Sequence, residues 1–144
     1  MTVARLTTDS AIRMHLRREL NAHLTQLGYT DARPTTKGPI IPEIVRMNPV
    51  RGRIVYGETI LSTDLGRPTC HERLLSFSQR RTRHRSSILF FIGVVETHQA
   101  ELEALLEELE IRSAVGGGHV HVVPIAAPQK SKARQKTTRQ KKCG

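Results

Sequence analysis

The chain has 144 residues, of which 25% are charged and 3% aromatic, and its formal net charge is +10. This length suffices for one domain with a single core but not for two domains. The strong positive charge indicates a polyanionic partner. The two cysteines, Cys70 and Cys143, indicate neither a disulfide framework nor a zinc site. Because the sequence has no apolar leader and no apolar run of membrane-spanning length, we expect a cytoplasmic protein without a membrane partner.

Apolar residues recur at three- and four-residue spacing before Gly28, which predicts an amphipathic helix over Ala11 to Leu27. Asp9 or Ser10 is the expected N-cap, and Gly28 is the expected stop. The buried stripe consists of Ile12, Leu16, Leu20, Leu24 and Leu27. The outer face carries three arginines that are either solvated or in contact with phosphate, namely Arg13, Arg17 and Arg18.

Two short β-runs follow, Ile40 to Met47 and Arg53 to Leu61, and a turn containing Pro and Gly joins them. This pattern predicts a β-hairpin. If the turn is centred near Val50, Glu43 on the first strand lies opposite or diagonal to Glu58 on the second. Their carboxylates would then be close enough to share a ligand.

The second half of the chain predicts two more helices and two more strands. Thr69, with Glu72 three residues later, has the spacing of a capping box and predicts a helix start. The continuous apolar run from Ser87 to Val95 is typical of a central strand that is buried on both faces. Next come a helix with an acidic outer face and a final strand, over Gln99 to Ile111 and His119 to Ile125.

The order helix, strand, strand, helix, buried strand, helix, strand predicts an α/β sandwich with a mixed sheet. An antiparallel hairpin would lead into parallel strands joined by helices. We expect one domain over residues 1–127. Residues 128–144 are polar and basic and cannot bury enough surface to offset their chain entropy, so we expect a disordered tail.

The hairpin residues also resemble a known family. Pro42-Glu43, a hairpin, an apolar strand and then Glu58-Thr59-Ile60 resemble the PD-(D/E)xK nuclease superfamily, over roughly Ala11 to Ile125. The resemblance implies a restriction-endonuclease-like α-β-β-α-β-α-β fold, with Mg²⁺ held by Glu43 and Glu58. The chain departs from the family pattern at Ile60, which stands where the catalytic lysine is expected. The resemblance therefore argues for the fold more strongly than for the activity.

Three other residues bear on the implied site. Arg73, on the helix after the hairpin, can lean toward Glu58 and replace the charge of the missing lysine, although an arginine cannot act as a base. Lys37 is the one lysine before the tail, and it is either a second source of that charge or an ordinary loop residue. Glu19 on the first helix either joins the metal site, as an acid there does in the resembled family, or forms a surface ion pair.

Two acid-free basic segments are candidates for binding nucleic acid. The tail carries seven of the ten excess positive charges and is either a loose phosphate grip or a solubilising segment. The other segment is an arginine run that is either a phosphate contact or a solvated charge run. The candidate residues are Arg80, Arg81, Arg83 and Arg85 in the run and Lys130, Lys132, Arg134, Lys136, Arg139, Lys141 and Lys142 in the tail.

These observations support three hypotheses for the function. The first is a nucleic-acid-binding protein, with DNA favoured over RNA, on a nuclease-like scaffold whose catalysis is lost or reduced. The second is an active Mg²⁺-dependent DNA endonuclease in which Glu43 and Glu58 work with a relocated basic residue. The third is a structural or assembly subunit that docks on RNA or on an acidic partner. A homodimer is left open in each case.

Overall fold

The structure is a computed structural model that describes residues 8–32, 40–50, 52–79 and 88–128. Lys37, the arginine run Arg80 to Arg85 and the basic tail from Gln129 onward lie outside the described residues. Within the described ranges, no helix combines the length and the apolar character needed to cross a membrane.

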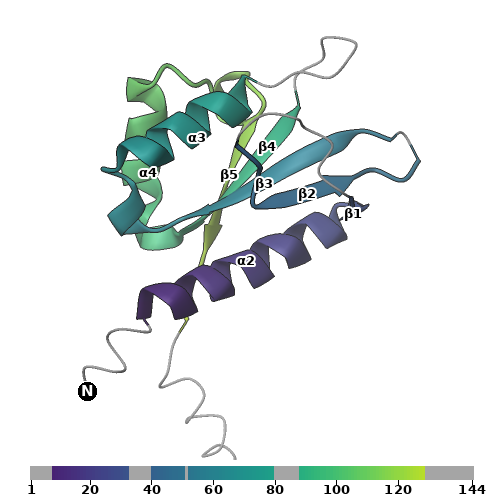
Figure 1. The fold of residues 1–144 in the computed structure, drawn as a ribbon, viewed down its shortest axis with the longest axis horizontal. Coiled ribbons are helices and arrows are strands. Elements are labelled where there is room, and N and C mark those ends of the chain that lie inside the picture. Colours follow the sequence, from purple (N-terminus) through teal and green to yellow (C-terminus); the bar gives the residue numbers. More distant parts are fainter. Residues whose placement is uncertain (1–7, 33–39, 51, 80–87, 129–144) are drawn as a thin grey trace, which may run out of the picture.

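A five-stranded mixed sheet forms the middle layer, with the strand order β1-β2-β3-β4-β5 (Figure 1). The first two pairings are antiparallel, and the β3–β4 and β4–β5 pairings are parallel. The expected mixed sheet is therefore confirmed. The sequence pattern does not predict β1, because two residues are too few to show an alternation. The strands are β1 (Thr30–Asp31), β2 (Ile44–Met47), β3 (Ile54–Ile60), β4 (Leu89–Val95) and β5 (Val120–Ile125).

Helices cover both faces of the sheet (Figure 1). One face packs against α2, and the other packs against α3 and α4. Alternation along β3 explains this, because Val55 packs with the leucines of α2 whereas Tyr56 and Ile60 pack on the opposite side. The α/β sandwich is thus confirmed. The helices are α2 (Thr8–Gln26), α3 (Pro68–Ser78) and α4 (Gln99–Glu108), with short 3₁₀ turns η1 (Ser62–Asp64), η2 (Glu96–His98) and η3 (Ala114–Gly116).

The predicted stripe of α2 is largely correct, since Leu16, Leu20 and Leu24 are fully buried. The predicted N-cap is wrong, because the helix begins at Thr8 and includes both Asp9 and Ser10 in its first turn. An acidic residue in that turn is favourable beside the positive end of the helix dipole.

The helix α2 is stopped by Gly28, as the sequence predicts, and its end is a Schellman motif. Gly28 has a φ of +96°, a left-handed conformation that favours glycine. Its N–H donates to the Thr25 carbonyl, and the Tyr29 N–H donates to the Leu24 carbonyl, both at 3.0 Å. Leu27 falls outside the helix and is 50% exposed, so it does not extend the buried stripe.

The hairpin is confirmed, with Ile44 opposite Gly57 and Met47 opposite Ile54. Its first strand is shorter than predicted and begins at Ile44 instead of Ile40. Pro42 has no N–H to donate to a ladder, and the N–H of Glu43 donates to the Glu58 side chain instead of to a strand. The segment before β2 is therefore held by a side chain.

Two further helix boundaries correct the sequence prediction. The N-cap of α3 is Arg67 and not Thr69, because Pro68 occupies the first helical position, where its missing N–H costs nothing. α4 ends at Glu108 and not at Ile111. Glu110 adopts a φ of 61°, and the Ile111 N–H turns back to the Leu106 carbonyl.

Arg46 on β2 connects the hairpin to the end of α2 and was not singled out by the sequence pattern. Its side chain is buried, with a residue exposure of 8%. It donates to the Tyr29 carbonyl at 2.9 Å, to Asp31 Oδ1 at 3.0 Å and to Asn21 Oδ1 at 3.3 Å, and it also contacts the Thr25 hydroxyl. These bonds fix the position of α2 over the hairpin.

Candidate functional site

The candidate site lies where the second half of β3 meets the segment before β2. Because side chains alternate along a strand, Glu58 and Ile60 face α3 whereas Thr59 faces α2. The hairpin register places Glu43 beside Glu58, and the Glu43 N–H donates to Glu58 Oε2 at 2.6 Å. The hairpin thus brings the two acids together across the strand pair.

Arg73 of α3 binds Glu58 through one edge of its guanidinium, at two points. Its Nε donates to Oε1 at 3.1 Å and its Nη2 donates to Oε2 at 2.7 Å. Nη2 also donates to the Ile41 carbonyl at 2.9 Å, and the guanidinium lies 5.1 Å from the centre of the Phe77 ring. This two-point contact fixes the geometry of the pair. The sequence prediction that Arg73 leans toward Glu58 describes this arrangement.

Burial raises the pKa of Glu58, and the hydrogen bonds from Arg73 and from the Glu43 N–H oppose this rise without cancelling it. The same pair raises the pKa of Arg73, chiefly through its hydrogen bond to Glu58. The raised pKa disfavours the charged form of Glu58, whereas it favours the charged form of Arg73. The two side chains respond differently because they differ in exposure. The Glu58 side chain is only 8% exposed and loses most of its hydration, whereas Arg73 is 36% exposed and keeps much of its own.

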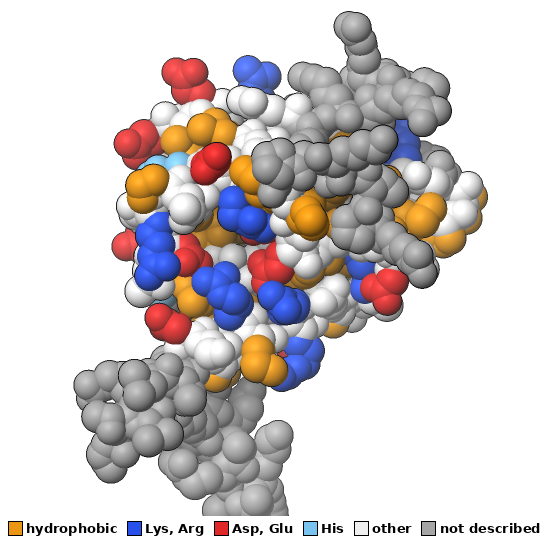
Figure 2. Space-filling view, in the orientation of Figure 1, with side chains coloured by type: hydrophobic (Ala, Val, Ile, Leu, Met, Phe, Trp, Pro, Cys, Tyr) orange, Lys and Arg blue, Asp and Glu red, His pale blue; other side chains and the backbone are white. Residues whose placement is uncertain are grey.

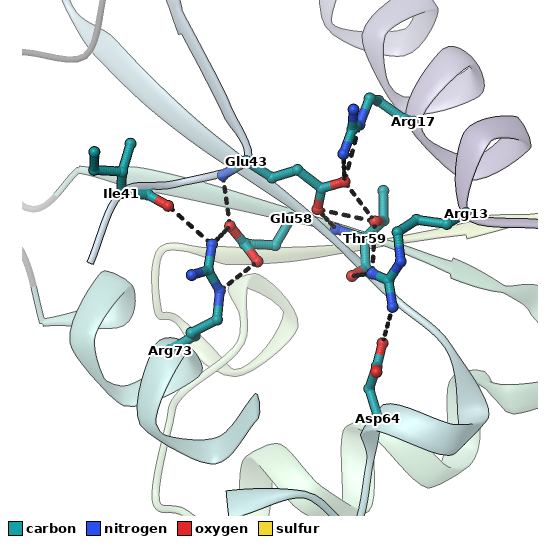
Figure 3. A network of polar contacts seen from close by, with 8 residues as sticks. All are labelled: Arg13, Arg17, Ile41, Glu43, Glu58, Thr59, Asp64 and Arg73. Atoms are coloured by element: carbon teal, nitrogen blue, oxygen red, sulfur yellow. Dashed lines mark hydrogen bonds and ion pairs between the residues drawn. The ribbon is translucent and has the colours of Figure 1, made fainter. Parts of the chain in front are cut away.

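Glu43 is bound from the other side, by α2 and by Thr59. Its Oε1 accepts from the Thr59 N–H and lies 2.9 Å from the Thr59 hydroxyl. Its Oε2 accepts from Nε and Nη2 of Arg17 at 2.9 and 2.6 Å. Glu43 and Glu58 therefore diverge, one toward α2 and the other toward α3 (Figure 3).

A third ion pair extends this network along the end of β3. Arg13 donates from Nη1 to the Thr59 carbonyl at 3.1 Å and from Nη2 to Asp64 Oδ2 at 2.7 Å. The same Asp64 oxygen accepts from the Leu61 N–H at 2.9 Å, which holds the chain as it leaves β3. The network thus joins α2, the hairpin and α3 (Figure 3).

The charges of this network are layered, with the acids beneath the arginines. The side chains of Glu43, Glu58 and Asp64 are 11%, 8% and 15% exposed, whereas those of their arginine partners are 35% to 51% exposed. Basic side chains gather in the middle of the face drawn in Figure 2, with acidic side chains among them. The described ranges contain no lysine, so these cations are all arginines.

The arrangement does not fit a Mg²⁺ ion between Glu43 and Glu58. Magnesium requires near-octahedral oxygen coordination, yet every oxygen of both carboxylates already accepts hydrogen bonds from protein N–H or hydroxyl groups. Ile60, at the lysine position of the resembled family, is 3% exposed and packs in the core. Among the described residues, no group of three or more His, Cys, Asp or Glu side chains is placed to hold a metal ion.

Cys70 lies beside this network, and its surroundings disfavour the thiolate. Burial raises the pKa of its thiol to about 11, and the nearby charges of Asp64 and Glu58 add to the effect. Since the thiolate is the reactive form, this shift lowers the reactivity of the thiol near neutral pH.

Within the described residues, no other candidate residue joins this network. Glu19 is exposed on α2 and does not join it, while Lys37 and both basic segments lie outside the described residues. His119 contacts the Ser78 carbonyl through Nε2, whereas His121 stacks on Phe91 at 4.7 Å.

The sequence pattern missed four members of the network, namely Arg13, Arg17, Thr59 and Asp64. Their interactions join residues 16 to 51 positions apart, apart from the local bond between Asp64 and Leu61. The expectation of a shared outer face for Arg13 and Arg17 needs correction, because both turn back toward the hairpin. One available signal was their four-residue spacing beside the leucine stripe, which places both at the border of the packed face.

Comparisons of the chain with protein-family models, with curated proteins and with solved structures found no match. The interpretation of this site therefore depends on its geometry.

Proposed function

We propose that this chain is a nucleic-acid-binding protein on a scaffold related to that of the PD-(D/E)xK nucleases, and that it no longer hydrolyses its ligand. DNA is favoured over RNA, as the resemblance implies. The observation that carries the proposal is that a guanidinium binds each carboxylate of the Glu43 and Glu58 pair. Arginine cations therefore stand where the resembled family would hold a metal ion and a lysine.

Two features support the nuclease-like scaffold. The chain runs from a helix through an antiparallel hairpin to a helix, a parallel strand, a helix and a last parallel strand. This is the order expected from the resemblance, with β1 added at the edge. The two acids also adjoin across the hairpin. A protein that had lost hydrolysis could keep this framework because the arginines satisfy the buried carboxylates.

The distribution of charge supports nucleic acid as the ligand. Arginine is well suited to phosphate, since its planar fork donates two parallel hydrogen bonds. The arginine run and the tail add cations without any acid among them. The acidic outer face of α4 lies on the opposite side of the sheet from α2, which leaves the α2 side for a polyanion.

The first test is binding. Fluorescence anisotropy with a labelled duplex DNA and an RNA of the same length, over a range of salt concentrations, should show tight binding that weakens steeply with salt. DNA should bind more tightly than RNA. Absence of binding to either ligand at 50 mM salt would refute the proposal and favour an assembly subunit with an acidic partner.

The second test is hydrolysis. Supercoiled plasmid incubated with the full chain in millimolar Mg²⁺ or Mn²⁺ should stay supercoiled, because neither carboxylate is open to a metal ion. The control variant is Glu58→Gln, which removes one of the two acids. Nicking by the unmodified chain that Glu58→Gln abolishes would refute the loss of catalysis and establish an active endonuclease.

A further inference from the structure

A groove of about 380 Å³ lies beside the carboxylate network, between the first half of α2 and the connection from β3 to α3. Three arginines line it, namely Arg13 and Arg17 from α2 and Arg67 from the position before α3. They come from two elements separated by some fifty residues in sequence, and the fold brings them to one hollow.

Two of these arginines are held in place from beneath. Asp64 binds Arg13 and Glu43 binds Arg17, and both acids are much less exposed than their partners. A guanidinium has five N–H donors, and these ion pairs use only part of them. Within the described part of the chain, Nε of Arg13 and Nη1 of Arg17 have no hydrogen-bond partner. The half-buried acids thus orient the two arginines and leave donors for a ligand.

The other walls of the groove are also suited to an anion. Arg67 is exposed, and its side chain makes no hydrogen bond or ion pair within the described ranges. Asp9 and Ser10 place the first turn of the 19-residue helix α2 in the groove. The positive end of its helix dipole favours a negative charge there. One feature opposes this, since the Asp9 carboxylate stands at the same rim.

We propose that this groove binds a backbone phosphate of the nucleic acid, with Arg13, Arg17 and Arg67 as its donors. The inference rests on the proposed function and specifies where the folded body, as distinct from the tail, holds the ligand. It also assigns a role to the half-buried acids Glu43 and Asp64, which position the arginines for phosphate. Arg67 contacts phosphate without such support.

The test compares Arg67→Gln with Arg18→Gln in the full chain. Both changes remove one exposed arginine charge, but Arg18 is not among the residues that line the groove. Arg67→Gln should weaken duplex binding about equally for all sequences. It should also reduce the slope of log affinity against log salt concentration by about 0.9, the value for one lost phosphate contact. Arg18→Gln should leave the slope unchanged, and equal slopes for the two variants would overturn the inference.

A second variant, expected to raise the affinity for DNA instead of lowering it, strengthens the test. Asp9→Asn removes the one carboxylate at the rim that has no arginine partner within the described residues, so it should raise affinity for duplex DNA. A decrease in affinity with an unchanged melting temperature would contradict a phosphate in this groove.

Titration with inorganic phosphate tests phosphate binding in the groove independently of the proposed function. Backbone amide NMR signals of Ser10 and of residue 67 should shift with phosphate in the unmodified chain and not in Arg67→Gln. If these shifts occur but no nucleic acid binds, the groove is a phosphate site and the proposed function is wrong. If nucleic acid binds, but phosphate shifts no signal and Arg67→Gln leaves the affinity unchanged, the groove is not a phosphate site and the proposed function stands.

Discussion

At the scale of single residues, the site is defined by two carboxylates that each keep a charged partner although they are almost buried. Arg73 holds Glu58 and Arg17 holds Glu43, so the two acids can adjoin without a metal ion between them. Removing one partner of such a pair is expected to destabilise the fold strongly, because the other charge stays buried and unpaired.

The raised pKa of Glu58 predicts how the stability of the folded protein changes with pH. Its folded-state pKa lies above the reference value of 4.5, so its contribution to stability is fully present below about pH 4.5. That contribution is lost as the pH rises through the folded-state pKa. The free energy of unfolding of Glu58→Gln, relative to the unmodified chain, should therefore increase as the pH rises from 4 to 7.

Urea titrations at several pH values measure this difference. Glu72→Gln is the matched control, since Glu72 is an exposed glutamate on the same helix, and its difference from the unmodified chain should show little change with pH. A Glu58→Gln curve that ran parallel to that of the unmodified chain would contradict the raised pKa.

Ile60→Lys tests the lysine position directly. Ile60 shares a face with Glu58, but it is 3% exposed and packs with Leu74 and Phe77. A buried ammonium there should lower stability by several kcal/mol, measured by chemical denaturation. Ile60→Met, an apolar control, should cost less than about 1.5 kcal/mol. A stable Ile60→Lys protein that cleaved DNA with Mg²⁺ would show that the scaffold needs only the lysine to hydrolyse its ligand.

At the scale of elements, α2 supplies both core packing and two arginines of the site, Arg13 and Arg17, so its end must be well fixed. Gly28→Ala should destabilise the protein by about 1 to 2 kcal/mol, because its left-handed φ of +96° is unfavourable for a residue with a Cβ. Gly66→Ala is the control, since no atom lies near its added Cβ and its φ is not positive. Thermal unfolding of both variants measures the difference, and equal melting temperatures would show that the Gly28 conformation contributes little.

The helices and strands were predictable where a sequence pattern repeats over many residues. Their boundaries were not predictable where a single residue or contact sets them. The leucine spacing of α2, the hairpin and the apolar run of β4 predict the layers correctly because each pattern samples many residues. The start of α3 depends on Pro68 alone, and the capping-box spacing at Thr69 is the wrong signal there. In the site, Arg73 was predictable from its place on the helix after the hairpin. Thr59 and Asp64 were not, because their partners lie far away in sequence.

At the scale of the whole molecule, the positive charge is unevenly distributed. The described ranges contain eight arginines and all thirteen acidic residues, although the complete chain has a net charge of +10. The excess of cations therefore belongs to segments outside these ranges, the tail above all. If the groove binds phosphate as proposed, it does so through local geometry, since the described residues carry more acids than arginines.

Truncation after Ala127 should therefore weaken duplex binding strongly at 100 mM salt. The slope of log affinity against log salt concentration should fall by up to about 6, since each of the seven tail cations can contribute about 0.9. A full-length variant with those cations changed to glutamine separates lost charge from lost length. Binding by the truncated chain that matched the full chain would remove the tail from the interface.

The absence of lysine from the described ranges makes the two kinds of cation chemically separable. Reagents that acylate primary amines modify lysine but leave guanidinium groups unchanged. The chain has six lysines, namely Lys37 and five in the tail, so complete acylation would neutralise five of the seven tail charges. Every arginine of the groove would keep its charge. A lysine acetyltransferase acting on this protein would therefore lower the positive charge of the tail, with no effect on the arginines of the groove.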